Sequence, residues 1–246
     1  MSIRDHTSQR LFVAPNLTAG TTFAATADQA NYLRNVLRLQ AGARLAVFNG
    51  RDGEWTAEIA EAGKRLVTLH AIEQRRGQVD GPDLHYLFAP LKRARLDYMV
   101  QKAVEMGVAR LTPVITRHTV AERVNGDRMR ANAVEAAEQC GILRVPAIDA
   151  PVALANLLAA WDGARRIVFC DEAQAPACPI EALRGLGRGP LAVLIGPEGG
   201  FDQDERRLLR GRPFVTAIAL GPRIMRADTA AVAALALVNA VLGDWA

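Results

Sequence analysis

Two Gly-Pro turns hold the residues of this chain whose types and spacing suit binding chemistry. Residues 194–201 read LIGPEGGF and residues 220–230 read LGPRIMRADTA, so each turn ends an apolar run and precedes a charged helix start. Proline fixes its own φ, whereas Gly199 and Gly200 can take positive φ and let the backbone approach a ligand closely. Such turns offer backbone amides and carbonyls, which suit a flat heterocycle that needs a donor and an acceptor at fixed positions.

Spacing excludes two familiar glycine loops at these turns. GPEGGF lacks the GK[ST] ending of a phosphate-binding loop, and it also lacks the GxGxxG spacing of a dinucleotide-binding turn. Plainer interpretations stay open for both segments. Asp202 and Glu205 form a capping-box pattern, so part of the first segment can be helix initiation. The second segment, GPRIMR, can be a loop that packs against its own domain.

The second part of the chain must position these turns. From Leu84 onward, short apolar runs alternate with helical patterns, which predicts an α/β domain with a mostly parallel sheet over residues 84–246. Ligands of such sheets lie where loops leave the carboxyl ends of the strands, so both turns are well placed to form a pocket. Helices are predicted over residues 91–106, around 128–141, after Pro151, after about residue 171, from Asp202 and over 229–243.

The first part of the chain has a different pattern. Residues 1–73 contain mostly short β-type runs separated by Asn-Gly and Asp-Gly turn signals, which predicts a small β-barrel with one amphipathic helix. Asp28 is predicted to cap that helix and Gly42 to end it. Residues 74–83, QRRGQVDGPD, are polar and lack apolar periodicity, which predicts a linker between two domains.

Composition narrows the function classes. The net charge is +4, and only three of the thirty Lys and Arg residues are lysines. Arginine suits bidentate phosphate contacts, although a GC-rich genome favours the same composition. Three cysteines without a CxxC pair argue against a disulfide framework and against a metal site, so we interpret them as buried or incidental thiols. The absence of a membrane-span pattern and of a signal-like N-terminus predicts a cytoplasmic protein.

Several motifs in a fixed order make the resemblance to a known family specific. The two turns, in their order near the end of an α/β domain, strongly resemble those of the SPOUT methyltransferases. Within that superfamily the chain resembles the ribosomal RNA small-subunit methyltransferase E family over nearly its whole length. The further runs that carry the likeness are RLFV (10–13), NVLRL (35–39), QKAVEMGV (101–108), LTPVITRH (111–118) and EAAEQC (135–140).

The resemblance implies a fold, a reaction and partners. Residues 1–73 would form a PUA-like β-barrel that helps to hold RNA, and residues 84–246 a SPOUT domain with a C-terminal trefoil knot. The reaction would be methylation of N3 of a uridine in 16S rRNA of the small subunit, with S-adenosylmethionine (SAM) as methyl donor. The enzyme would be a homodimer whose active site is completed across the subunit interface.

The match also assigns site residues. The residues expected to surround the adenosine and methionine of SAM are Leu194, Gly196, Pro197, Glu198, Gly199, Gly200, Leu220, Gly221, Ile224, Met225, Arg226 and Thr229. The candidates for contacts with RNA phosphates are Arg34, Arg38, Lys92, Arg95, Lys102, Arg117 and Arg144, for each of which a surface salt bridge is the plainer alternative.

Uridine N3 carries a proton at neutral pH and must lose it before methylation. The candidates that assist are an arginine that stabilises the developing anion, Arg226 or Arg10, and a carboxylate base, Glu105 or Asp228. Asp228 stands where the family commonly has a glutamate, so its reach is one methylene shorter. Similarly, Asn31 replaces a common histidine. Ile142 and Leu143 follow EQCG where the family often has Arg-Asn, which leaves Arg144 as the remaining arginine there.

Two other functions fit parts of the same sequence. A SPOUT enzyme that acts on tRNA or on 23S rRNA would share the two turns, but it should lack the PUA-like N-terminus and the NVLR helix. A non-catalytic ribosome-assembly factor would keep the basic residues and would not bind the cofactor.

Overall fold

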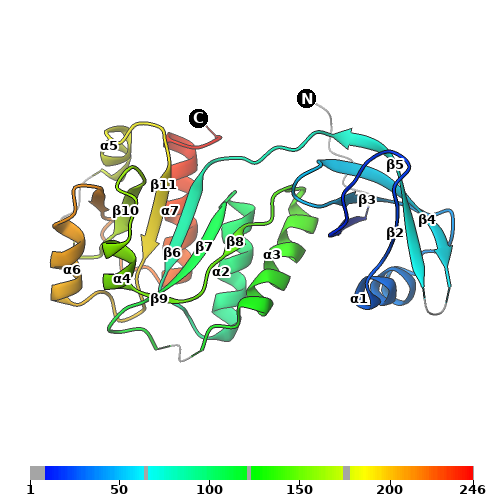
Figure 1. The fold of residues 1–246 in the computed structure, drawn as a ribbon. Coiled ribbons are helices and arrows are strands. Elements are labelled where there is room, and N and C mark those ends of the chain that lie inside the picture. Colours follow the sequence, from blue (N-terminus) through cyan, green and yellow to red (C-terminus); the bar gives the residue numbers. More distant parts are fainter. Residues whose placement is uncertain (1–8, 64–65, 121–122, 174–177, 246) are drawn as a thin grey trace. The chain divides into compact units, whose positions relative to one another are not determined.

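The computed structural model describes residues 9–63, 66–120, 123–173 and 178–245. The chain divides into two compact units, Met1–Asp80 with Ala137–Arg144 and Gly81–Ala136 with Val145–Ala246 (Figure 1). The sequence predicts a simpler division at residues 73 and 84. The observed division differs from this prediction in two ways. The last strand of the first unit continues to Arg76, and Ala137–Arg144 groups with the first unit.

A five-stranded sheet forms the N-terminal unit, in the order β1-β3-β4-β5-β2. β1 pairs with β3 in parallel, and the other neighbours are antiparallel. Leu33, Leu45, Ile59 and Leu69 are among the buried side chains that hold the sheet and its one helical segment together. The strands are β1 (Arg10–Phe12), β2 (Thr22–Ala24), β3 (Arg44–Phe48), β4 (Glu54–Ala62) and β5 (Val67–Arg76).

The helical segment of this unit begins and ends differently from its prediction. α1 (Ala27–Asn31) continues into the π-helical turn η1 (Tyr32–Val36). Thr26, not Asp28, is the N-cap, because the Thr26 hydroxyl accepts from Gln29 N at 3.3 Å while the Gln29 side chain accepts from Thr26 N at 2.9 Å. The prediction that the helix reaches Gly42 is also wrong, since η1 ends at Val36.

A buried carboxylate joins two arginines in the N-terminal unit. Glu54 Oε2 accepts from Arg10 Nε at 2.7 Å and from Arg76 Nη2 at 3.0 Å, and the Glu54 side chain is only 8% exposed. Burial raises the pKa of Glu54, but the hydrogen bonds from the two arginines outweigh burial and hold this pKa below its ordinary value.

The same two arginines bind the C-terminal carbonyls of α3 (Gly126–Cys140) and of the turn after it. Arg10 Nη1 donates to Glu138 O at 2.7 Å, and Arg76 Nη2 donates to Gly141 O at 2.6 Å. Cations are favourable at a helix C-terminus, where the carbonyls lack helical partners. These contacts explain why Ala137–Arg144 groups with the N-terminal unit.

A parallel sheet forms the second unit, as predicted. Its order is β12-β10-β11-β6-β7-β8, every neighbouring pair is parallel, and β9 pairs with β7. β6 and β11 are buried along their whole length, which is typical of strands covered on both faces. The strands are β6 (Leu84–Phe88), β7 (Arg110–Ile115), β8 (Ala147–Ile148), β9 (Val152–Ala153), β10 (Arg166–Cys170), β11 (Leu191–Ile195) and β12 (Val215–Ile218).

Helices cover this sheet (Figure 1). Leu158 and Leu209 pack with Phe169 and Leu194 in one apolar cluster on one face. Helices α2 and α7 also contact each other. Asn239 Nδ2 of α7 donates to the carbonyl of Met106, the residue directly after α2, at 2.8 Å. The helices are α2 (Arg93–Glu105), α4 (Leu154–Ala159), α5 (Pro179–Arg184), α6 (Gln203–Arg210) and α7 (Ala227–Val241). Within the described ranges, no helix has the length and apolar character that a membrane crossing demands.

The connectivity of the sheet brings distant segments together. The chain passes from β6 to β7, later adds β10, and then inserts β11 between β10 and β6 before β12 joins the outer side of β10. The carboxyl ends of β10, β11 and β12 therefore lie side by side at one edge. Strand order alone does not test the trefoil knot, which stays a prediction.

The buried carboxylate yields a stability prediction. Glu54→Gln should lower the free energy of unfolding by about 3 kcal/mol at pH 7, because it leaves two arginines without their charged partner. Glu58→Gln, on the same strand, is the matched control, since its exposed pair with Arg44 should contribute less than about 1 kcal/mol. Urea unfolding followed by circular dichroism measures both changes.

The pH dependence of this effect has a defined sign. The Glu54 pKa is lowered in the folded chain, so its contribution is present above the ordinary pKa of 4.5 and is lost as the pH falls below it. The difference between wild type and Glu54→Gln should therefore shrink on acidification. A difference that grows between pH 7 and about pH 3.5 would contradict the assigned ion pairs.

Candidate functional site

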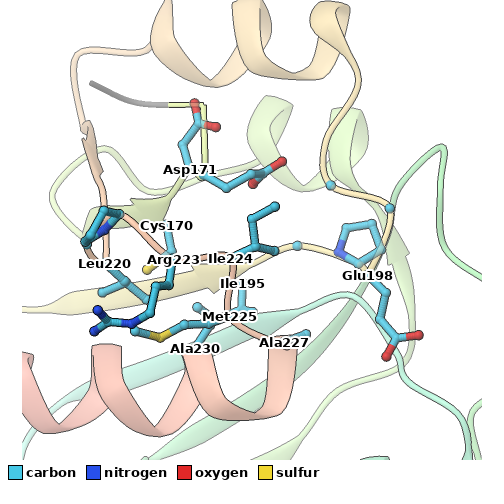
Figure 2. A pocket seen from close by; sticks show the side chains of 17 residues that line it. Cys170, Asp171, Ile195, Glu198, Leu220, Arg223, Ile224, Met225, Ala227 and Ala230 are labelled. Atoms are coloured by element: carbon cyan, nitrogen blue, oxygen red, sulfur yellow. The ribbon is translucent and has the colours of Figure 1, made fainter. Parts of the chain in front are cut away.

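A pocket with a volume of about 300 Å³ lies at the carboxyl ends of β10 and β11, between the two Gly-Pro turns (Figure 2). Its wall comes from three segments that are far apart in the sequence. The lining residues are Cys170, Asp171, Glu172, Ile195, Gly196, Pro197, Glu198, Gly199, Gly200, Leu220, Gly221, Pro222, Arg223, Ile224, Met225, Ala227 and Ala230.

The first turn needs its glycines for three different reasons. A Cβ at Gly196 would overlap the Phe201 ring, and a Cβ at Gly200 would overlap the Glu172 carboxylate. Gly200 also uses the freedom of glycine, with a φ of +68°. Gly199 does not have a positive φ, and a Cβ there would instead press on His118 at 3.2 Å. The turn thus packs its backbone closely against side chains on both sides.

The helix after this turn fixes where the turn ends. Asp202 Oδ1 accepts from Glu205 N at 2.7 Å and Glu205 Oε2 accepts from Asp202 N at 3.1 Å, which confirms the predicted capping box. The hydrogen bond from the Glu205 backbone lowers the pKa of Asp202. His118 Nδ1 also lies 3.0 Å from Gly200 O. Helix initiation and pocket formation therefore use the same segment.

The second turn is exposed rather than packed. Gly221 has a φ of +99°, and Ile224 is 93% exposed although it lines the pocket. This exposure contradicts the interpretation of GPRIMR as a loop packed against its own domain. Arg226 is the N-cap residue of α7 and makes no side-chain cap hydrogen bond. The first turns of α7 contribute Ala227 and Ala230 to the pocket wall.

The third segment of the wall follows β10 and was not predicted. Asp171, whose side chain is fully buried, is ion-paired to Arg206 at 3.1 Å and to Arg210, and Arg206 also pairs with Glu172. Burial raises the pKa of the neighbouring Cys170 to about 12, so this thiol stays protonated. The sequence did show that a strand, RIVFC, ends just before Asp171. It did not show that the end of this strand lies beside the two turns, because that depends on the strand order.

The structure brings most of the predicted cofactor residues together. Nine of the twelve line the pocket, and the other three lie beside it in the chain. Leu194 is buried within β11, while Arg226 and Thr229 flank the lining residues of α7. In the described part of the chain, no group of three or more His, Cys, Asp or Glu side chains could hold a metal ion.

The four candidates for N3 deprotonation have separate surroundings. Arg226 and Asp228 flank the lining residue Ala227, and Asp228 Oδ1 accepts from Thr229 N at 2.9 Å. Arg10 belongs to the N-terminal unit, where its guanidinium binds Glu54 and carbonyls at the end of α3. Glu105 pairs with Lys102 at 2.7 Å in the last turn of α2.

Several candidates for RNA contacts have protein partners. Arg95 is ion-paired with Glu198, Lys102 with Glu105, and Arg117 with Asp202 at 3.3 Å. Arg34 and Arg144 also interact with other residues. The remaining two are exposed: Lys92 is the N-cap residue of α2, and Arg38 follows η1 with a φ of +57°.

Comparison with known families identifies the kind of domain that the second unit forms. Residues 80–239 match the model of an RNA methyltransferase domain. The chain belongs to the RNA methyltransferase family. Residues 25–72 match an RNA methyltransferase PUA domain, which confirms the PUA-like character predicted for the first part of the chain.

Relatives and solved structures of RNA methyltransferases extend the match to nearly the whole chain. A ribosomal RNA small subunit methyltransferase E from Rickettsia conorii is 29% identical over 94% of this chain and 94% of its own length. A putative methyltransferase from Legionella pneumophila, solved with the bound cofactor SAM, has a TM-score of 0.85 and 27% identity over 96% of this chain and 99% of its own. The resemblance to the small-subunit methyltransferase E family is thereby confirmed.

A third comparison concerns the fold. A ribosomal RNA small subunit methyltransferase E from Neisseria gonorrhoeae, solved with S-adenosyl methionine, is 22% identical and covers 97% of this chain and 100% of its own, with a TM-score of 0.85. The order of secondary structure in both units is therefore shared at low sequence identity.

The close packing of the first turn yields the second prediction. Gly196→Ala should lower the free energy of unfolding by about 1–3 kcal/mol, because the new methyl group overlaps the Phe201 ring. Gly126→Ala is the control, because its new methyl group would have no described atom within 4 Å apart from its chain neighbours and its own helix backbone, and because its φ is not positive. This control should change stability by less than about 0.5 kcal/mol. Thermal and urea unfolding report both.

A second substitution checks the stated cause. If the clash with Phe201 is responsible, Phe201→Leu should relieve part of the cost of Gly196→Ala, and the two substitutions should couple by about 0.5 kcal/mol or more in a double-mutant cycle. Strict additivity of the two substitutions would show that Gly196 is needed for another reason.

Proposed function

We propose that this chain transfers a methyl group from SAM to N3 of a uridine in the 16S rRNA of the small ribosomal subunit. The observation that carries the proposal is the pocket between the two Gly-Pro turns, in a chain that matches methyltransferase E relatives along nearly its whole length. The relative from Legionella pneumophila that holds bound SAM supports the choice of cofactor.

The pocket residues fit this cofactor. Its volume of about 300 Å³ lies at the lower end of the range for ligand pockets, and its wall combines backbone polar groups with apolar side chains. Amides and carbonyls of the two turns suit the edge of adenine, while Ile195, Leu220 and Met225 offer apolar surface. When bound, SAM supplies an electrophilic methyl group. The chain's own residues orient the reactants and exclude water, which is the main requirement of an in-line displacement.

Proton removal from N3 calls for a group beside the pocket. We favour Arg226 as the group that stabilises the developing anion and Asp228 as the base, because both flank a lining residue of α7. Arg10 and Glu105 are weaker candidates, since each is engaged with other partners. N3 lies on the base-pairing edge, so the uridine must be unpaired or flipped out when it is methylated.

The same proposal includes an assembly and a substrate surface. We propose a homodimer in the cytoplasm, with residues 1–76, which end with β5, as the RNA-holding domain, 77–83 as the linker and 84–246 as a knotted SPOUT domain. The exposed cations Arg38 and Lys92 are the preferred contacts to phosphates, because neither forms an ion pair with another residue of the described ranges. Binding that rests on such contacts weakens steeply with salt.

The third prediction tests the reaction directly. Deletion of the gene should abolish 3-methyluridine at one position of 16S rRNA, and wild-type protein with SAM should restore the mark on small subunits or rRNA from the deletion strain. Mass spectrometry of nuclease digests measures the modified nucleoside, with tRNA and 23S rRNA from the same cells as controls.

Each outcome of this experiment has a defined meaning. Persistence of 3-methyluridine in 16S rRNA would refute the proposed substrate, and loss of a methyl group from tRNA or 23S rRNA instead would favour a different RNA. A protein that binds RNA but gives no binding heat with millimolar SAM would be a non-catalytic factor.

A further inference from the structure

Three carboxylates line the pocket, and each of them is ion-paired to an arginine. Asp171 pairs with Arg206 and Arg210, and Glu172 pairs with Arg206. The third, Glu198, lies in the first Gly-Pro turn. Arg206 and Arg210 both belong to α6 and do not line the pocket, so they compensate Asp171 and Glu172 from outside the pocket wall.

Glu198 has a different kind of partner from the other two. It pairs with Arg95 of α2, and both side chains are partly exposed, at 52% for Glu198 and 37% for Arg95. Figure 2 shows the Glu198 side chain at the edge of the pocket, on the turn that leaves β11. The ion pair therefore joins the turn to α2 and compensates the one lining carboxylate that solvent reaches most easily.

Charge compensation matters because the proposed reaction removes a positive charge. When the methyl group moves to N3, the electron pair of the broken C–S bond stays on sulfur, the N3 electron pair forms the new bond, and the N3 proton leaves to a base. The sulfonium thereby becomes a neutral thioether. An uncompensated carboxylate near it would stabilise the bound cation more than the transition state, in which that charge is already decreasing.

We propose that Arg95 is a positioning residue of the cofactor pocket, which holds and neutralises Glu198 so that the pocket does not bind the sulfonium form too tightly relative to the product. This inference rests on the proposed function. It gives Arg95 a role distinct from the phosphate contact predicted from the sequence. Arg206 pairs with Glu172 in the same way, in a less exposed position.

A binding experiment on the purified full chain tests the role without turnover. Isothermal calorimetry gives the Kd of SAM and of its demethylated product, S-adenosylhomocysteine, which differ in charge at sulfur. In Arg95→Gln the ratio of product Kd to SAM Kd should rise about fivefold, because Glu198 then attracts the cation without compensation. In the double variant Arg95→Gln with Glu198→Gln, this ratio should return to within about twofold of wild type.

A matched control and a kinetic readout separate this role from others. Arg207→Gln removes an arginine of α6 whose pair with Asp204 is exposed and outside the pocket, so it should leave the ratio unchanged. With rRNA substrate at saturating SAM, kcat should fall in Arg95→Gln and stay at the wild-type value in Arg207→Gln. An unchanged Kd ratio in Arg95→Gln, together with a raised KM for rRNA alone, would overturn the inference and make Arg95 an RNA contact.

The proposed function can fail in a distinguishable way. If wild-type protein binds neither SAM nor its product, the proposed function is wrong and this inference is wrong with it. If wild type binds both and the ratio shifts equally in the single and double variants, the proposed function stands and only the role of Arg95 is refuted.

Discussion

The insertion of β11 between β10 and β6 is the constraint on which the rest of the second unit depends. It places the end of β10 next to the turns that follow β11 and β12, although these segments are far apart in the chain. Parallel pairing then aligns their carboxyl ends at one edge. Without this order, Asp171 and Glu172 would not meet the Gly-Pro turns, and the pocket would lose one of its three walls.

Arginine has two structural uses here that are independent of the proposed contacts with RNA. Arg10 and Arg76 compensate the buried Glu54 and bind carbonyls at the end of α3, while Arg95, Arg206 and Arg210 compensate carboxylates of the pocket. The planar guanidinium suits both tasks, since it can bind two acceptors at once. The excess of arginine over lysine is therefore partly explained by paired sites within the fold.

Local sequence signals predicted most helices and strands, whereas features that depend on which strands pair with each other could not be predicted. The capping box at Asp202 and the alternation after Leu84 depend on neighbouring residues, so both could be predicted locally. The nine predicted residues that line the pocket came instead from the family resemblance. The wall after β10 could not be predicted, because a linear sequence does not state which strands are neighbours. The grouping of Ala137–Arg144 with the first unit was missed for the same reason. At Thr26 the error was local, since threonine and aspartate are both good N-caps and only the partner Gln29 decides between them.

The first Gly-Pro turn shows why helix initiation and ligand binding are not competing explanations. The capping box fixes the start of α6, and α6 in turn supplies the arginines that hold Asp171 and Glu172. Glu172 occupies the space where a side chain at position 200 would lie, so the glycine is required by the same ion pair. The backbone of the turn is thus held in place before any ligand arrives, and a pocket held in this way needs little ordering on binding. Its affinity can then come from shape and backbone hydrogen bonds, which leaves the charges free to be balanced for the chemical step.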